Sequence, residues 1–138
     1  MNDMKWNCFL DDFRIPRQVT WVKLPLVDWV IVRNYGEFVN AVKTRGIPTR
    51  VSWDHDLAPN HYVQALGGKK DDSYEENGAD CAKWLVNYCI AKGVPLPEYW
   101  VHSMNPAGAD NIRSILESAR GAINDAIRAK ESVANRKK

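Results

Sequence analysis

Four short apolar runs, each bounded by polar or turn-forming residues, divide the chain into candidate strands. They cover residues 5–10, 28–33, 49–53 and 98–101. Continuous apolar and aromatic runs of this length are typical of strands buried in a mainly parallel sheet. The pattern therefore predicts a four-stranded sheet.

Three other stretches carry apolar residues at helical spacing. The predicted helices cover residues 35–45, 78–92 and 106 to about 133. The first two end at Gly46 and Gly93, as helices commonly do. The third begins with Asn105 before Pro106, an N-cap residue followed by a proline at the first helical position. Between the first two strands no helix fits, because Pro16 and Pro25 interrupt residues 13–27 and leave an irregular crossover.

The order of these elements predicts an α/β fold. Right-handed crossovers, with the winding reversed after the second strand, give a mainly parallel sheet of order 2-1-3-4 with flanking helices, a flavodoxin-like or receiver-like three-layer sandwich. In such sheets the ligand crevice opens at the carboxyl ends of the strands where the winding reverses, here between the first and third strands.

The 138 residues, 45% of them hydrophobic, suit one globular domain, which we place at residues 1–120. Residues 58–77 form a polar, glycine-containing segment that is either a lid over the site or a surface insertion. Residues 121–138 form a basic helical extension or tail. It is either a frayed terminus or a contact for RNA or for a second copy of the chain.

Composition narrows the class of protein. No apolar run reaches the roughly 20 residues of a membrane span and no signal-peptide pattern begins the chain, so we expect a cytoplasmic protein without a membrane partner. Three cysteines without metal-site spacing indicate buried free thiols. The net charge of +2 is too small to indicate nucleic-acid binding by itself.

Acidic residues follow the first and third predicted strands. Asp11 and Asp12 end the first, and Asp54 and Asp56 flank His55 at the end of the third. Four carboxylates in one crevice repel each other unless a cation neutralises them. All-oxygen ligation suits Mg²⁺ or Mn²⁺. The alternative is that single aspartates cap helices or accept backbone hydrogen bonds.

Two histidines are candidates for proton transfer, because the pKa of histidine lies near working pH. His55 lies within the acidic cluster, and His102 follows the fourth strand. Alternation along an extended strand would place Asp54 and Asp56 on one side and His55 on the other. Either histidine can instead be structural, and His61 in the long loop is expected to be exposed.

Ser103, Asn105 and the helix start at Pro106 are candidates for phosphate binding. Backbone N–H groups at a helix start attract anions, and hydroxyl and amide side chains can add hydrogen bonds. The alternative is an ordinary helix cap.

Five motifs resemble the cyclic-phosphate processing receiver-like family of bacteria and their phages. They lie between residue 8 and about residue 116: F-L-D-D from Phe9, R-N-Y-x-E-F-V from Arg33, S-x-D-H-D-L from Ser52, G-x-D-x-x-x-W-L from Gly78 and V-H-S-x-N-P-x-G-x-x-N-I from Val101. The resemblance implies a reduced receiver fold and a role in processing cyclic phosphates on nucleotides or RNA ends. It also adds Asn111 to the candidate phosphate-binding residues.

Relative to true receivers, Asp11 and Asp12 resemble the metal-binding acidic pair, Asp54 the phosphoacceptor and Ser103 the switch hydroxyl. The chain departs from them because it has no fifth strand to supply a lysine, and it adds His55, Asp56, His102 and Asn105. We therefore expect metal-dependent hydrolysis of a cyclic phosphate. The alternatives are a module that binds a cyclic nucleotide or nucleic acid without cleavage, and a degenerate receiver that binds another protein.

Overall fold

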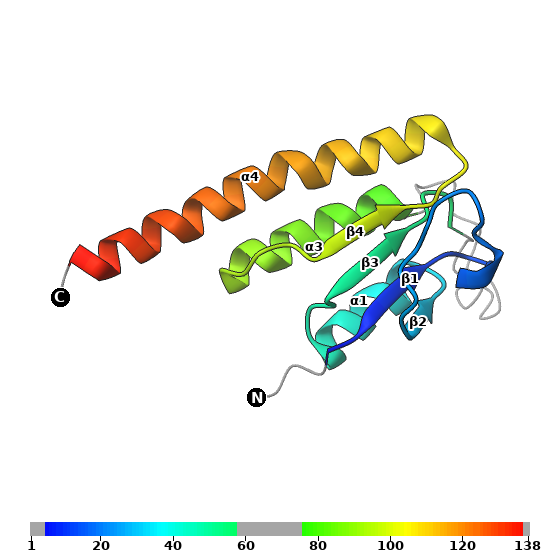
Figure 1. The fold of residues 1–138 in the computed structure, drawn as a ribbon, viewed down its shortest axis with the longest axis horizontal. Helices are drawn as coiled ribbons and strands as arrows, with labels where there is room; N and C mark the ends of the chain where they lie inside the picture. The colour runs from blue at the N-terminus through cyan, green and yellow to red at the C-terminus, as the bar shows by residue number, and fades with distance from the viewer. Residues whose placement is uncertain (1–4, 58–75, 137–138) are drawn as a thin grey trace, which may run out of the picture.

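The computed structural model describes residues 5–57 and 76–136 (Figure 1). Its strands are β1 (Asn7–Leu10), β2 (Trp29–Val32), β3 (Arg50–Trp53) and β4 (Glu98–Val101). Its helices are the 3₁₀-helix η1 (Pro16–Gln18) and the α-helices α1 (Tyr35–Arg45), α3 (Gly78–Lys92) and α4 (Pro106–Arg136). All the predicted strands and helices are present, and their ends differ from the predicted ones by at most a few residues.

The sheet is parallel throughout and has the order β2-β1-β3-β4, as predicted. The connection from β1 to β2 contains no α-helix among its residues, only η1. Proline at both ends of this connection explains why, since each ring removes a backbone donor and restricts φ. The two following crossovers each carry a helix, and these two helices pack against each other.

Side-chain caps fix where α1 and α3 begin, and glycines fix where they end. Asn34 accepts a hydrogen bond from the backbone N–H of Glu37 at the start of α1. At the start of α3, Asn77 and Asp80 form a reciprocal capping box. Gly93 ends α3 in the left-handed conformation, with φ of 68°, which a residue with a Cβ adopts only at a cost.

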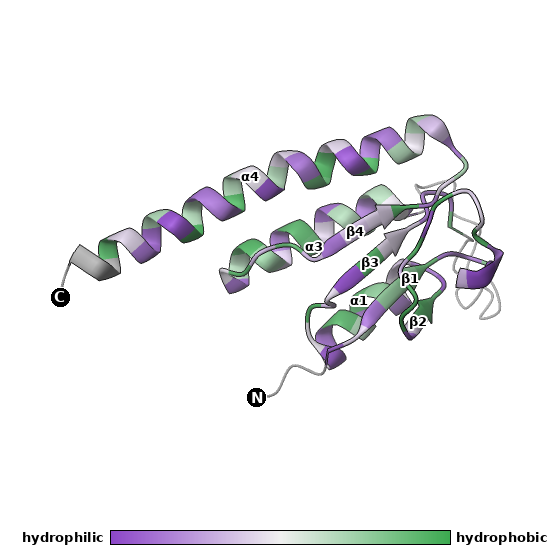
Figure 2. Cartoon of the chain, in the orientation of Figure 1, coloured by the Kyte–Doolittle hydropathy of each residue, from purple (hydrophilic) through white to green (hydrophobic). Residues whose placement is uncertain are grey.

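One face of the sheet carries the hydrophobic core. The core strand residues on this face are Cys8, Leu10, Val32, Val51, Trp53 and Val101. They pack with buried residues of all three α-helices, namely Phe38, Ala41 and Val42 of α1, Ala79, Cys81, Ala82, Leu85 and Cys89 of α3, and Ala109, Ile112, Leu116 and Ile123 of α4. All three cysteines are free and buried, as predicted. Figure 2 shows hydrophobic positions alternating with hydrophilic ones along α4.

The opposite face of the sheet carries a row of aromatic rings. Phe9 meets Trp29 edge to face, and Trp29 meets Trp100 in the same way. None of these three residues belongs to the helical core cluster. The β1–β2 crossover approaches this face, because Trp29 and crossover residues such as Val19 line the same cavity of about 750 Å³. The crossover thus lies against the face of the sheet on which none of the described α-helices packs.

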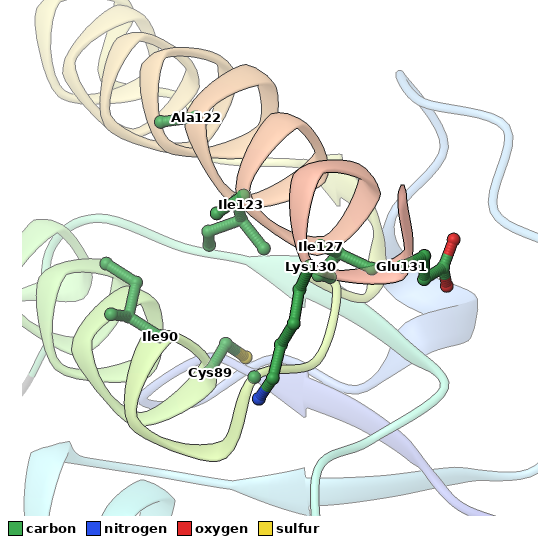
Figure 3. A pocket seen from close by; sticks show the side chains of 9 residues that line it. Cys89, Ile90, Ala122, Ile123, Ile127, Lys130 and Glu131 are labelled. Carbon is green, nitrogen blue, oxygen red and sulfur yellow. The ribbon is translucent and has the colours of Figure 1, made fainter. Parts of the chain in front are cut away.

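Helix α4 runs past the end of α3 and projects from the body of the domain (Figure 1). It continues without a break through residue 120, where the sequence suggested a domain boundary. Between its projecting half and the end of α3 lies an apolar groove of about 590 Å³ (Figure 3). Among the described helices, none has the length and hydrophobicity that crossing a membrane requires.

Candidate functional site

Asp11 and Asp54 are brought side by side by the register of two neighbouring strands. Leu10 of β1 pairs with Trp53 of β3, so that the next residue of each strand emerges at the same edge. The backbone N–H of Asp54 donates to the carbonyl of Leu10 over 3.0 Å and continues the ladder beyond the strands. The sheet edge at which the sequence predicted a ligand crevice therefore carries two neighbouring carboxylates.

His102 joins these carboxylates from the end of β4. Its backbone N–H donates to the carbonyl of Trp53 over 2.9 Å. One potential ligand atom of each of Asp11, Asp54 and His102 lies within 4.8 Å of the other two. All three residues are buried. This buried set, which we call the acidic cluster, could hold a metal ion.

His102 is fixed through both of its ring nitrogens. Its Nε2 lies 2.9 Å from Oδ2 of Asp11, and its Nδ1 lies 2.6 Å from the hydroxyl of Ser52. Since a carboxylate only accepts, Nε2 carries the proton and Nδ1 accepts from Ser52. The ring also stacks on Phe9, with centroids 4.6 Å apart. These are the residue types of a serine hydrolase triad, but Ser52 is completely buried and cannot reach a substrate.

Hydrogen bonds hold Asp11 in its ionised form. Burial by itself would raise the pKa of this carboxyl, but hydrogen bonds from His102 and from the backbone of Arg14 and Phe13 outweigh burial and lower the pKa to about 2. The two backbone donors lie 2.8 Å and 3.0 Å from Oδ1. Asp11 is therefore a permanent negative charge next to Asp54.

The pKa of Asp54 is shifted in the opposite direction from that of Asp11. Burial, followed by the charges of Asp11 and Asp12, raises the pKa of its carboxyl to about 7. Asp12 is half-buried, and burial and the charge of Asp11 raise its pKa too. Three acids whose charges disfavour one another fit a bound cation, because a cation stabilises their ionised forms. The donor set of carboxylate oxygens suits Mg²⁺ or Mn²⁺.

Asp56 does not join Asp54 as strand alternation predicted. Strand β3 ends at Trp53, and the side chain of Asp56 is 72% exposed. Its carboxylate instead binds Nδ1 of His55 at 2.8 Å and accepts from Nδ2 of Asn105 at 3.3 Å. The hydrogen bond from His55 is the main cause of the lowered pKa of Asp56. The alternation failed because the chain leaves the extended conformation directly after the strand.

Two glycines let helices approach this segment closely. A Cβ on Gly108 of α4 would lie 2.3 Å from Cγ of His55. A Cβ on Gly78 of α3 would overlap the carbonyl oxygen of Asp54, and the Gly78 N–H donates to the His55 carbonyl over 2.7 Å. Both glycines allow helix starts to pack directly on residues 54 and 55.

Ser103 and Asn105 form the cap of α4. The Ser103 hydroxyl accepts from the backbone N–H of Asn105 at 3.2 Å, and Asn105 Oδ1 accepts from the N–H of Gly108 at 3.1 Å. Pro106 has no N–H, so these bonds leave the start of α4 few donors for an anion. Asn111 is exposed on α4, one turn after Gly108. The ordinary cap thus explains Asn105, while the Ser103 hydroxyl keeps its own proton to donate.

Two residues beside the cluster were missed by the sequence reasoning. The Arg14 guanidinium lies 3.6 Å from Oδ2 of Asp11, and the indole N–H of Trp21 donates to the His102 carbonyl over 2.8 Å. Both belong to the irregular crossover, which has no periodicity to indicate which side chains point at the site. The spacing of Arg14, three residues after Asp11, was the one available signal. His61 and most of the proposed lid, residues 58–75, lie outside the described residues.

Comparison with known families agrees with this arrangement. The model of the cyclic-phosphate processing receiver domain matches residues 6–118, which is most of the chain. The chain belongs to this family. The match covers every strand, α1, α3 and the first part of α4, and leaves the projecting part of α4 outside the family domain. No curated protein and no solved structure matches the chain.

Proposed function

We propose that this receiver-family domain hydrolyses a cyclic phosphate on a nucleotide or an RNA end with the help of a divalent cation. The observation that carries the proposal is the acidic cluster, in which Asp54 is buried beside the permanently charged Asp11. Two buried carboxylates this close together repel each other when both are ionised, which is costly for folding. Perturbed pKa values in such a cluster are typical of functional sites.

Asp11, Asp12 and Asp54 would hold the cation, Mg²⁺ or Mn²⁺. A cation bound there supplies Lewis acidity, which polarises a phosphoryl oxygen and lowers the pKa of a water. The hydrogen bond from His102 orients the Asp11 carboxylate, in the way that groups behind metal ligands commonly do. Asp56 has its own partners in His55 and Asn105, so we assign it to His55 rather than to the cation.

His55 is the better candidate of the two histidines for moving a proton. Both ring nitrogens of His102 are occupied by Ser52 and Asp11. The hydrogen bond between His55 and Asp56 involves Nδ1, so Nε2 is the nitrogen left to meet a substrate. A carboxylate behind the ring fixes its orientation and tautomer, as in other general bases.

We assign phosphate binding to the Ser103 hydroxyl and the Arg14 guanidinium. Ser103 uses its oxygen to accept from Asn105, which leaves its O–H to donate. Arg14 brings a planar group of several donors, which suits a phosphate, to the edge of the cluster. Asn105 contributes by holding Ser103 and Asp56 in place. In a covalent variant of this mechanism Asp54 is the nucleophile and forms an aspartyl-phosphate.

The test is turnover of cyclic phosphates. Nucleotides with 2′,3′- and 3′,5′-cyclic phosphates are incubated with Mg²⁺ or Mn²⁺, and phosphorus NMR follows ring opening. We expect one class to be hydrolysed, and the Asp54→Asn variant to be at least a hundredfold slower with its fold retained. Absence of turnover with every member refutes the hydrolase. Calorimetry then separates a module that binds these ligands unchanged from a degenerate receiver that ignores them.

A further inference from the structure

An exposed group of aromatic and apolar side chains borders the acidic cluster. It consists of Phe13, Trp21 and Met104 around the less exposed side chain of Arg14, and we call these four residues the aromatic rim. Phe13 is 65% exposed, Trp21 42% and Met104 63%. Large apolar side chains gathered in one exposed place commonly mark a binding surface. The rim is assembled from the β1–β2 crossover and the residues after β4, so the packing of distant segments creates it.

Arg14 is the centre of the rim. Its guanidinium carbon lies 4.5 Å from the centroid of the Phe13 ring and 5.3 Å from that of Trp21. One terminal nitrogen faces Oδ2 of Asp11, and the other lies 3.5 Å from Sδ of Met104. The guanidinium is therefore held between the buried carboxylate and the exposed rings. A cation in this position stiffens the rim and carries positive charge to it.

The rim is anchored to the acidic cluster at a second point. The indole N–H of Trp21 donates to the carbonyl of His102, whose ring belongs to the cluster. Arg33 donates to the carbonyls of Asp11 and Arg14 over 3.2 Å and 2.7 Å and fixes the backbone between them. Exposed rings that are held this firmly lose little conformational entropy when a ligand stacks on them.

We propose that the aromatic rim binds the base of a nucleotide whose phosphate lies at the acidic cluster. This rests on the proposed function and adds the place where the nucleobase binds, so that the site selects a nucleotide over a bare sugar phosphate. A flat base stacks on an exposed aromatic ring, and Arg14 attracts the phosphate of the same molecule. Stacking on one ring tolerates any base, because every base has a π-face.

The test measures binding rather than turnover, so that it stands apart from the test of hydrolysis. Calorimetry in the presence of Mg²⁺ compares adenosine 3′-monophosphate, ribose 5-phosphate and inorganic phosphate on the wild type, Phe13→Ala and Phe13→Trp. We expect the wild type to bind the nucleotide at least tenfold more tightly than the two base-free probes. Phe13→Ala removes about tenfold of the nucleotide affinity, whereas Phe13→Trp keeps it and neither variant changes the affinity for phosphate.

A matched control is Val133→Ala, which removes a half-exposed apolar side chain from the far end of α4 and leaves all three affinities unchanged. Equal affinity of the wild type for the nucleotide and for ribose 5-phosphate overturns the proposal. So does a Phe13→Ala variant that binds the nucleotide as the wild type does. Base-dependent binding without hydrolysis of any cyclic phosphate upholds the rim and refutes only the hydrolase.

Discussion

Nε2 of His102 lies 2.9 Å from Oδ2 of Asp11, and both side chains are completely buried. The contact joins the end of β4 to the end of β1 across the intervening strand β3. The hydroxyl of Ser52 on β3 binds the other ring nitrogen. The hydrogen bonds among Ser52, His102 and Asp11 therefore link three strands and fix the position of the permanent negative charge of the acidic cluster.

The first prediction concerns the hydrogen bonds among Ser52, His102 and Asp11. His102→Phe keeps a ring that can stack on Phe9 but leaves the Ser52 hydroxyl and the Asp11 carboxylate without their partner. Each unpaired buried group costs roughly 1–3 kcal/mol, so we expect the free energy of unfolding to fall by about 3 kcal/mol in urea denaturation. Ser52→Ala removes one weaker bond and costs about 1 kcal/mol. Equal stability of His102→Phe and the wild type would show that these hydrogen bonds contribute nothing to the free energy of unfolding.

The second prediction concerns pH in the absence of divalent cations. The pKa of Asp54 is raised to about 7 in the folded protein, so between about pH 4 and 7 the folded state binds a proton that the unfolded state has released. The free energy of unfolding therefore falls as pH rises through this window, by at most about 1.4 kcal/mol per pH unit. Thermal or urea unfolding at several pH values measures this slope.

Asp54→Asn is the control for that slope. The variant lacks the titrating carboxyl, so its stability varies less between pH 4 and 7 and exceeds that of the wild type at pH 8. Asp11 acts in the other direction, because its pKa is lowered to about 2 and its stabilisation is lost only as the pH falls below about 4. Identical pH profiles for the wild type and Asp54→Asn contradict the assignment.

The third prediction concerns the cation. At pH 8 Mg²⁺ should raise the melting temperature of the wild type, because it binds the ionised cluster of the folded state. At a hundred times its dissociation constant a ligand adds about 2.7 kcal/mol. The shift is smaller at pH 5.5, where Asp54 is protonated, and is lost in Asp54→Asn. A shift that is the same in the variant would place any bound Mg²⁺ elsewhere.

The fourth prediction uses two glycines of the same helix. A Cβ at Gly108 meets the His55 ring, whereas a Cβ at Gly121 meets nothing within 4 Å. Gly121→Ala should stabilise α4 by up to about 1 kcal/mol without affecting hydrolysis. Gly108→Ala displaces His55, and a displaced catalytic group commonly costs about a hundredfold in rate. Circular dichroism and initial rates on both variants check this, and full activity of Gly108→Ala would remove His55 from the mechanism.

The fifth prediction concerns the groove between α3 and α4. Ile90 of the groove is 57% exposed, and Lys130 and Glu131 of α4 are among the residues that line the groove (Figure 3). Because a two-fold axis can bring Lys130 of one copy to Glu131 of the other, we propose that a second copy of the chain covers the groove. Light scattering should then report a dimer, and Ile90→Lys a monomer whose circular dichroism spectrum remains that of the wild type.

The control for self-association is Leu26→Lys, which changes a fully exposed side chain of the crossover and should leave the dimer intact. A monomeric wild type at concentrations well above those of the activity assays contradicts the proposal. The candidate site does not depend on this outcome, because the family match ends at residue 118, before all of the groove residues of α4.

Much of the fold could be predicted because its signals are local. The boundaries of α1 and α3 follow from Asn34, Gly46, Asn77 and Gly93, whose side chains or φ angles act on their own helix ends. The strand order followed from the handedness of crossovers, which holds for nearly all parallel sheets. The crossover between β1 and β2 could be recognised only because it lacks hydrophobic periodicity. The positions of its side chains therefore could not be predicted.

The sequence by itself determined that acidic and imidazole side chains follow three strands, because polar residues directly after a buried apolar run must emerge at the sheet edge. Only the tertiary structure decided their partners. In the folded protein Asp11 pairs with His102, 91 residues away, and Asp56 pairs with His55. Arg14 and Trp21 lie together in the aromatic rim. Such choices depend on where each strand stops and on how side chains from distant elements pack. Hydrophobic periodicity in the sequence contains no information about the exact end of a strand or about contacts between distant side chains.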